Sequence, residues 1–268
     1  MSEKLLSVKN LSINVQEPNR QTKQKIVQQV NFDLLPGNVL GLLGGNGSGK
    51  TLTSLAILNL LQDKFYVSGQ IQYQGKDIFQ LPKKKLRQIR GNDIAMIAQN
   101  PMSSFNPVIS IGEHMIESLR AHKSLSRREA KDLAIYYLER MELDNPSGLI
   151  KRYPFQLSGG MLQRVMIAIT FSLQPKIIIA DEPTTALDDG TQEHILHQLE
   201  MIKHEYDSSI LLISHDFDVV SRLADDIAVM HNGMIVEKGS LVKVFNHPDH
   251  FYTKQLIDAR MRLKREIT

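Results

Sequence analysis

Apolar residues along the chain fall into short runs separated by polar and glycine-rich stretches, and this pattern predicts an α/β protein. Imperfect alternation over residues 5–15 predicts an edge strand, and a second strand is expected over residues 26–35. The wholly apolar run 39–43 is followed by a glycine-rich loop and by helical periodicity over residues 51–61. This part of the chain therefore predicts a strand, a loop and a helix in succession.

The second half of the chain repeats the strand and helix pattern after a long helical stretch. Residues 106–171 have helical periodicity and few strand signals. Strand-like runs return at residues 176–180, 209–213 and 227–230, with a helix expected over 192–204. Such alternation predicts a mostly parallel sheet covered by helices.

The ends of these runs suggest how the domain is organised. A turn at residues 231–234 leads into a last strand, and a basic helical tail follows Pro248. We expect one domain over residues 1–268. Its core comprises residues 1–98 and 172–245, a helical subdomain covers 99–171, and the tail covers 246–268.

Composition excludes several classes of protein. The formal charge is +3 and basic residues are spread along the chain, so no surface dedicated to nucleic acid is indicated. The absence of cysteine excludes disulfides, thiolate metal sites and iron–sulfur clusters. No stretch approaches 18 consecutive apolar residues and the N-terminus does not resemble a signal peptide. Any role at a membrane is expected to depend on a partner.

The glycine-rich loop has the pattern G-x-x-x-x-G-K-[ST], which is typical of phosphate-binding loops. Glycines allow backbone N–H groups to surround phosphates, Lys50 reaches the β and γ oxygens, and the Thr51 hydroxyl is a ligand for Mg²⁺. The positive end of the following helix favours the same anion. The predicted nucleotide-binding residues are Gly44, Gly45, Asn46, Gly47, Ser48, Gly49, Lys50, Thr51 and Leu52.

Two carboxylates, Asp181 and Glu182, follow an apolar run at the position where α/β sheets bind ligands. We expect Asp181 to hold Mg²⁺ through water and Glu182 to orient or deprotonate the attacking water. An acidic pair after a strand is by itself more often an exposed turn or a helix cap. The phosphate loop in the same chain favours the catalytic interpretation.

These motifs resemble those of the ATP-binding subunits of ABC transporters over nearly the whole chain. Gln99 resembles the Q-loop glutamine, residues 157–161 the signature motif, residues 186–188 the D-loop, and His215 the switch histidine. The resemblance implies a P-loop NTPase (RecA-like) core with a mostly parallel sheet, an N-terminal antiparallel β region and an inserted helical subdomain. It also implies ATP and Mg²⁺ as cofactors.

The resemblance further implies a head-to-tail pair of such domains. Ser158, Gly159, Gly160 and Asp188 would then serve the nucleotide held by the other domain, although Ser158 alone predicts only a helix N-cap. His215 would hydrogen-bond the γ-phosphate, and Gln99 would contact Mg²⁺ or the water and relay conformational change. The expected partners are a second ATPase subunit, either a copy or a sister, two membrane permeases and an extracytoplasmic solute-binding protein.

Finer features are similar to the peptide and nickel importer class. These are Met161 in the signature, residues 99–107 and 153–164, and the late pairs His247-Pro248 and Tyr252-Thr253. Within that class, residues 44–45 and 223–230 are similar to the nickel-import subunit, and the chain lacks the cysteine-bearing C-terminal extension common in peptide importers. This resemblance favours nickel over peptides. We therefore expect a peripheral ATPase on the cytoplasmic face of the inner membrane that powers uptake of nickel ions or a nickel chelate. The alternative is the same role in a peptide or other metal-chelate importer.

Two alternatives and one departure from the family pattern remain. A soluble ATPase acting on nucleic acid or ribosomes would need a coiled-coil insertion or tandem ATPase domains, and neither is present. The histidine pairs His194 and His197, and His247 and His250, have no carboxylate or cysteine set to complete a metal site.

Members of the family stack adenine on an aromatic ring where this chain has Val15. We expect weaker adenine discrimination, or a ring supplied by the polar loop or by the partner.

Overall fold

The computed structural model describes residues 4–16, 24–185 and 187–267. The chain forms two compact units, Met1–Leu86 with Ser209–Thr268, and Arg87–Ser208. The expected helical segment, residues 99–171, falls within the second unit, which extends beyond it at both ends. Each unit is described by itself.

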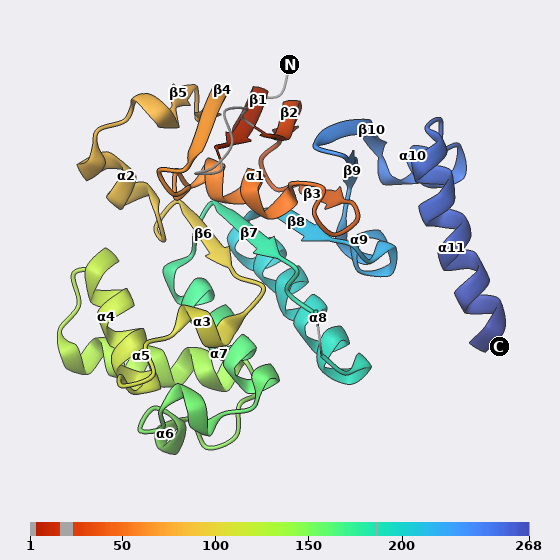
Figure 1. The fold of residues 1–268 in the computed structure, drawn as a ribbon. Helices are drawn as coiled ribbons and strands as arrows, with labels where there is room; N and C mark the ends of the chain where they lie inside the picture. The colour runs from red at the N-terminus through yellow and green to blue at the C-terminus, as the bar shows by residue number, and fades with distance from the viewer. Residues whose placement is uncertain (1–3, 17–23, 186, 268) are drawn as a thin grey trace. The chain divides into compact units, whose positions relative to one another are not determined.

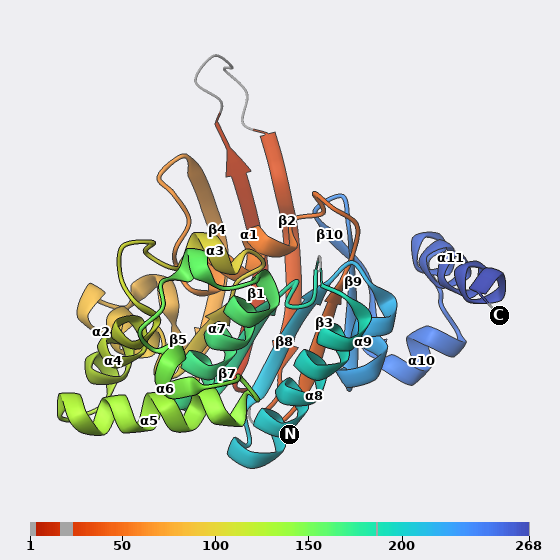
Figure 2. The same cartoon turned by 90° about the horizontal axis from the view of Figure 1, so that it is seen from below.

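The first unit contains an antiparallel sheet with the strand order β2-β1-β4-β5, in which β1 lies between β2 and β4 (Figure 2). Alternate side chains of β1 and β2 point to one buried face, as the apolar alternation requires. The bounds of these strands are β1 Leu6–Val15, β2 Gln24–Leu34, β4 Phe65–Tyr73 and β5 Lys76–Asp77.

The prediction that residues 5–15 form an edge strand is wrong. β1 is hydrogen-bonded on both sides, because Val8 pairs with Phe32 on β2 and with Ile71 on β4. Strand β4 was not predicted: exposed polar residues and Gly69 interrupt its apolar alternation. Its pairing with β1 depends on contacts about sixty residues apart, which local periodicity does not report.

The first unit also contains the central strand β3. Strand β3 pairs in parallel with β8 and β9, and β9 pairs antiparallel with β10. All five residues of β3 and all six of β8 are buried, which explains their continuous apolar runs. The bounds are β3 Val39–Leu43, β8 Ser209–Ser214, β9 Asp226–His231 and β10 Met234–Ser240.

Tight turns and helices complete the first unit. The predicted turn between β9 and β10 is confirmed, because Asn232 and Gly233 have φ of 47° and 80°, as a two-residue hairpin requires. The helix predicted over 51–61 ends earlier, at Ile57, where the chain turns through Asn59 with φ 50°. The helices are α1 Lys50–Ile57, α9 Phe217–Leu223, α10 Leu241–Asn246 and α11 Phe251–Ile267, together with the 3₁₀ turn Ile78–Gln80.

The second unit contains a parallel strand pair and a group of helices (Figure 1). The strands are β6 Ile94–Ile97 and β7 Ile177–Asp181. The helices are α3 Pro101–Ser104, α4 Ile111–His122, α5 Arg127–Arg140, α6 Pro146–Leu149, α7 Gly159–Leu173 and α8 Asp189–Tyr206, with a 3₁₀ turn at Pro154–Gln156; α2 Lys83–Ile89 spans the passage between the units.

Helix α7 forms the centre of the second unit. Ten of its fifteen residues are buried, and Phe171 is among the largest fully buried side chains. Helices α4 and α5 pack against α7. Both begin with a serine N-cap that accepts a backbone hydrogen bond, and Ser126 forms a full capping box with Glu129. The predicted helical character of residues 106–171 is therefore confirmed.

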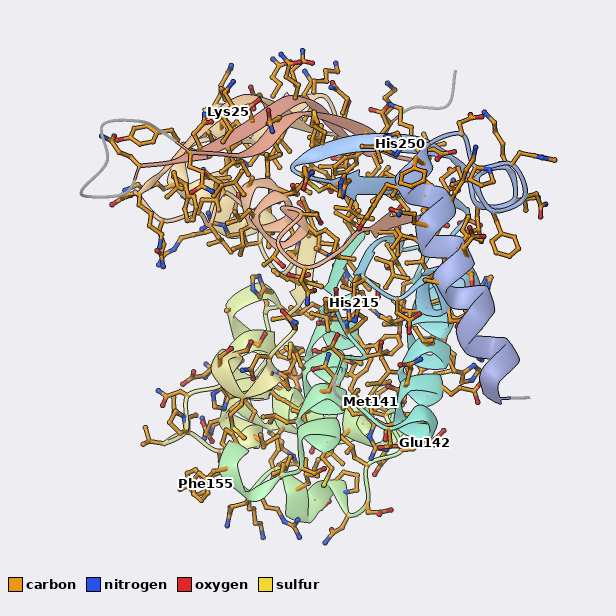
Figure 3. All side chains as sticks on the ribbon, turned by 45° about the vertical axis from the view of Figure 1, so that its right-hand side comes forward. Lys25, Met141, Glu142, Phe155, His215 and His250 are labelled. Carbon is orange, nitrogen blue, oxygen red and sulfur yellow. The ribbon has the colours of Figure 1, made fainter. Side chains whose placement is uncertain are left out.

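A polar cluster joins the end of α5 to the end of α8 within the second unit. The Arg140 guanidinium binds both carboxylate oxygens of Glu205 and lies 5.9 Å from the centre of the Phe171 ring. The hydroxyls of Tyr137 and Tyr206 are 3.3 Å apart. Figure 3 labels Met141 and Glu142 just beyond this end of α5. Within the described part of the chain, none of the helices has both the length and the apolar character needed to cross a bilayer.

Candidate nucleotide-binding site

The predicted phosphate loop connects the buried strand β3 to helix α1 in the first unit. Gly44 is packed so tightly that an added Cβ would lie 2.2 Å from the Met230 carbonyl oxygen. Gly49 is the N-cap of α1, and its φ of 103° lies in the region that favours glycine. An added Cβ at Gly49 would lie 2.9 Å from the Val27 side chain. The loop conformation therefore depends on glycine at these positions.

Lysine 50 lies at the centre of this loop. Its side chain is only 6% exposed, and its ammonium donates to the carbonyl oxygens of Gly44, at 2.6 Å, and Gly45, at 3.1 Å. A buried ammonium needs such acceptors or an anion. The loop thus holds a positive charge at the N-terminal end of α1, where the helix dipole has the same sign.

The remaining loop residues suit an anionic ligand. Asn46 and Gly47 are exposed, Leu52 is half-buried, and Thr51 is exposed in the first turn of α1. The Ser48 hydroxyl is buried and has no hydrogen-bond partner among the described residues. A buried hydroxyl without a partner is costly, and a phosphate oxygen is a suitable acceptor for it. This observation fits a bound phosphate group.

The predicted switch histidine follows β8 in the same unit as the phosphate loop. The Gly44 N–H donates to the Ser214 carbonyl oxygen at 3.3 Å, so the end of β8 is tied to the start of the loop. His215 is exposed and is labelled in Figure 3. The next residue, Asp216, caps α9 by accepting a hydrogen bond from the Asp218 N–H at 2.7 Å. His215 therefore lies between a fixed strand end and a capped helix.

The predicted acidic pair lies at the end of β7 in the second unit. Asp181 is the last residue of the strand and is 1% exposed, and Glu182 is 6% exposed. Glu182 has φ 49°, a left-handed conformation that is uncommon for residues other than glycine. Its carboxylate accepts a hydrogen bond from the Thr185 hydroxyl at 2.9 Å. The pair is thus buried and oriented, unlike an ordinary surface turn.

The structure brings Gln99, the signature segment and the residues after Glu182 to one cavity of about 460 Å³ in the second unit. Its lining includes Gln99, Gly159, Gln163 and Thr185. Gln163 is 2% exposed and its amide donates to the Pro183 carbonyl oxygen at 3.0 Å. Helix α7 is thereby linked to the segment that follows the catalytic candidate. Neither Gln163 nor Thr185 was among the residues predicted from sequence.

The signature and D-loop residues occupy helix starts. Ser158 caps α7 by accepting a hydrogen bond from the Met161 N–H, as predicted, and a Cβ at Gly159 would meet no atom within 4 Å. Gly160 is half-buried, and a Cβ there would lie 3.1 Å from Thr191. Asp188 caps α8, and its carboxylate accepts hydrogen bonds from the Thr191 N–H and the Thr191 hydroxyl. These bonds lower the pKa of the Asp188 carboxyl. Ala186 of the D-loop lies outside the described residues.

Strand β4 brings an aromatic residue next to Val15, where the sequence had shown none. Phe65 pairs directly with Val15 across the antiparallel strands, so the two side chains lie on the same face of the sheet. The following residue, Tyr66, is 45% exposed and donates its hydroxyl to Gln16. The sequence signal was present as Phe65-Tyr66, but its position beside Val15 required the strand pairing.

Two of the four histidines considered for a metal site, His194 and His250, have other contacts. His194 lies 3.6 Å from a Glu142 oxygen and 2.5 Å from the Gln198 amide nitrogen. His250, labelled in Figure 3 at the start of α11, accepts a hydrogen bond from the Tyr252 N–H. Among the residues with described side chains, no group of three His, Cys, Asp or Glu could hold a metal ion.

Comparison with known proteins assigns this arrangement to a family. The family model described as "ABC transporter" matches residues 27–185. The chain is 40% identical over 259 residues to the "Metal-staphylopine import system ATP-binding protein CntD" of Staphylococcus aureus (strain NCTC 8325 / PS 47), covering 97% of this chain and 94% of that protein. It is 44% identical over 256 residues to a putative peptide import ATP-binding protein of Brucella abortus (strain 2308), covering 95% of this chain and 76% of that protein.

A solved structure shares the fold. The dimeric, post-hydrolysis structure of the ATP-binding cassette MJ0796 bound to ADP and Pi is similar with a TM-score of 0.78 and 25% sequence identity. The match covers 88% of this chain and 98% of that one. The predicted fold class is confirmed: a P-loop NTPase fold with a mostly parallel sheet, an antiparallel N-terminal sheet and a helical subdomain.

Proposed function

Because this chain belongs to the ABC transporter family and is an ATP-hydrolysing subunit of an importer, we propose that it powers the uptake of nickel ions or a nickel chelate. The observation that carries the ATPase part of the proposal is the buried Lys50 ammonium, held by the Gly44 and Gly45 carbonyl oxygens beside the buried Ser48 hydroxyl. A phosphate chain satisfies both groups together.

The groups around the phosphates have separate roles. Lys50 and backbone N–H groups within residues 44–52 bind the phosphates, apart from those of Gly44 and Gly45, which donate to Ser214 and Tyr252. Thr51, Gln99 and, through water, Asp181 would hold Mg²⁺ by the oxygen ligands that this ion prefers, and the ion would neutralise phosphate charge when bound. The donor set fits the ion, because all three side chains offer oxygen and none offers sulfur.

Glu182 and His215 act at the terminal phosphate. Glu182 orients the attacking water and accepts its proton, and His215 hydrogen-bonds the γ-phosphate and responds to its release. The hydrogen bond from Thr185 to Glu182 supports this role, because it holds one carboxylate oxygen and directs the group. Catalysis then depends on position and charge, with no covalent intermediate.

A second ATPase subunit completes the site. Ser158, Gly159, Gly160 and Asp188 serve the nucleotide bound by that subunit, which is a copy of this chain or a sister. The exposure of Ser158 and Gly159 at the N-terminus of α7 supports this role, since the first N–H groups of a helix bind anions. One chain alone supplies only part of each of two sites.

The remaining partners are two membrane permeases and an extracytoplasmic solute-binding protein, with this chain peripheral on the cytoplasmic face of the membrane. In the second unit, Phe155, labelled in Figure 3, is 65% exposed. Its ring stacks on that of Tyr153, with centroids 5.8 Å apart. Exposed aromatic side chains of this kind are enriched at protein interfaces. The pair immediately precedes the signature segment, so a permease bound there would contact the residues next to Ser158.

Two solutes are supported by different relatives. The name of the S. aureus relative specifies metal-staphylopine import, and the alignment covers 94% of its length. The name of the Brucella relative specifies putative peptide import, at a slightly higher identity of 44%. Uptake of a metal ion or chelate is the function we propose, and peptide import is the second candidate.

Measurement of uptake in cells that lack this chain tests the proposal. We expect deletion to reduce accumulation of radioactive nickel, and expression of the wild-type chain to restore it. A Lys50→Ala variant expressed at the same level is the matched control and should not restore uptake. Unchanged nickel uptake with loss of peptide uptake would instead support the second candidate.

A further inference from the structure

The segment that enters helix α11 is fastened to strand β10 of the same unit. The Glu237 carboxylate accepts backbone hydrogen bonds from Asp249 at 2.8 Å and from His250 at 3.0 Å. The Tyr252 N–H donates to His250 Nδ1 at 3.1 Å, and Thr253 is fully buried. Tyr252 is therefore held at a fixed place in the first unit, where Figure 3 labels the neighbouring His250.

Tyr252 reaches the phosphate loop from this anchor. Its hydroxyl oxygen accepts a hydrogen bond from the Gly45 N–H at 3.0 Å, across 207 residues of sequence. Its ring stacks on His231, the last residue of β9, with centroids 3.9 Å apart and an interplanar angle of 28°. The stacking limits where the ring can lie, so the hydroxyl is fixed by both the backbone and the ring.

The contact acts on a peptide that also binds the loop lysine. The Gly45 N–H and the Gly44 carbonyl oxygen belong to one peptide group: the N–H donates to Tyr252, and the carbonyl oxygen accepts from the Lys50 ammonium at 2.6 Å. An added Cβ at Gly45 would lie 3.0 Å from the Tyr252 hydroxyl oxygen and would push it away. The hydroxyl of Tyr252 thus determines the position of an acceptor for Lys50.

We propose that Tyr252 is a positioning residue for ATP: it fixes the Gly45 part of the phosphate loop and, through it, the Lys50 ammonium. The inference rests on the proposed function, because the loop is taken to bind ATP. A binding loop that is already in its bound conformation loses less entropy when the ligand arrives. The hydroxyl of Tyr252 supplies part of this preorganisation from the C-terminal segment.

Titration of the full chain with a fluorescent ATP analogue tests the inference. Tyr252→Phe removes the hydroxyl and keeps the stacked ring, and we expect the Kd to rise about three- to tenfold, as loss of one hydrogen bond predicts. In ATPase assays with the same variant, KM should rise while kcat stays within about twofold. Tyr136→Phe, at a half-exposed tyrosine of the second unit, is the matched control and should bind as the wild type does.

A double-mutant cycle shows whether the effect passes through Gly45. Gly45→Ala displaces the hydroxyl, so adding Tyr252→Phe to it should cause less further loss than Tyr252→Phe causes alone. A rise in Kd below threefold for Tyr252→Phe, or losses that multiply in the double variant, would overturn the inference.

Thermal unfolding of the nucleotide-free variants guards against a general loss of structure. If Tyr252→Phe does not fold, His231→Ala tests the inference instead. It removes the ring that stacks on Tyr252 and so loosens the Tyr252 hydroxyl without deleting it. An unchanged Kd for ATP in His231→Ala would then overturn the inference. A wild-type chain that fails to bind ATP would refute the proposed function itself. Wild-type binding with no effect of Tyr252→Phe would refute only the role of Tyr252.

Discussion

The Thr185 hydroxyl donates a 2.9 Å hydrogen bond to the carboxylate of Glu182, three residues before it. The backbone supports the same turn, since the Thr185 N–H donates to the Glu182 carbonyl oxygen. Glu182 itself has φ 49°, a left-handed backbone conformation that residues other than glycine rarely adopt. The side-chain and backbone bonds together hold the carboxylate in one orientation.

Removal of this hydroxyl should slow hydrolysis without weakening ATP binding. We expect Thr185→Val to lower kcat about five- to tenfold, which corresponds to loss of one hydrogen bond to a charged group. The KM for ATP should change by less than about twofold. Thr170→Val is the matched control, because Thr170 is in the second unit too and its hydroxyl donates to the Met166 carbonyl oxygen instead of a carboxylate. Equal kcat in both variants would remove Thr185 from this role.

Substitution of the proposed base should separate binding from hydrolysis. Glu182→Gln keeps the shape of the side chain and removes its ability to accept a proton, so we expect hydrolysis to fall by about 100-fold or more. ATP binding should persist, and an ATP-bound dimer should accumulate. Size-exclusion chromatography with and without ATP measures the dimer, and phosphate release measures hydrolysis. Full turnover by this variant would show that another group is the base.

Phe65 is the aromatic residue that lies beside Val15, and its removal should reduce adenine selectivity. We expect Phe65→Ala to weaken ATP binding about fivefold and GTP binding less, since an aromatic contact contributes about 1 kcal/mol. Tyr66→Ala is the matched control, because successive residues of a strand point to opposite faces. Parallel titrations with ATP and GTP compare the variants. A strong ATP preference in Phe65→Ala would exclude this ring as the source of selectivity.

The Arg140–Glu205 pair should make stability depend on pH in the acid range. Hydrogen bonding by Arg140 lowers the pKa of Glu205 from its ordinary value of 4.5. A carboxyl with a lowered pKa stabilises the folded state at pH values above its ordinary pKa of 4.5. This contribution is lost as the pH falls through the folded-state pKa. Denaturant unfolding between about pH 6 and about pH 3 should therefore show a smaller loss of stability in Glu205→Gln than in the wild type. Glu139→Gln, at an exposed position of α5, should follow the wild-type curve.

Much of the phosphate loop was determined by sequence alone, because its conformation depends on neighbouring residues. Glycines at fixed spacing between an apolar run and a helix identify the loop and its lysine, and the structure shows that Lys50 is buried there. Ser158 was likewise recognised as a helix cap from local pattern, and the burial of β3 follows from its continuous apolar run. Each of these features has a sequence signal within a few residues, even where its packing involves residues farther along the chain.

Only the tertiary structure showed that β1 is an interior strand, that Phe65 lies beside Val15, and that Tyr252 bonds to Gly45. Strand register and the docking of a C-terminal segment arise from contacts between residues far apart in the chain, and such contacts leave no local periodicity. The sequence therefore determined which chemical groups are present and the local geometry of the loop. The tertiary structure decided which distant side chains hold that loop in place. The positions of those side chains depend on packing between segments far apart in the chain, which local sequence patterns do not report.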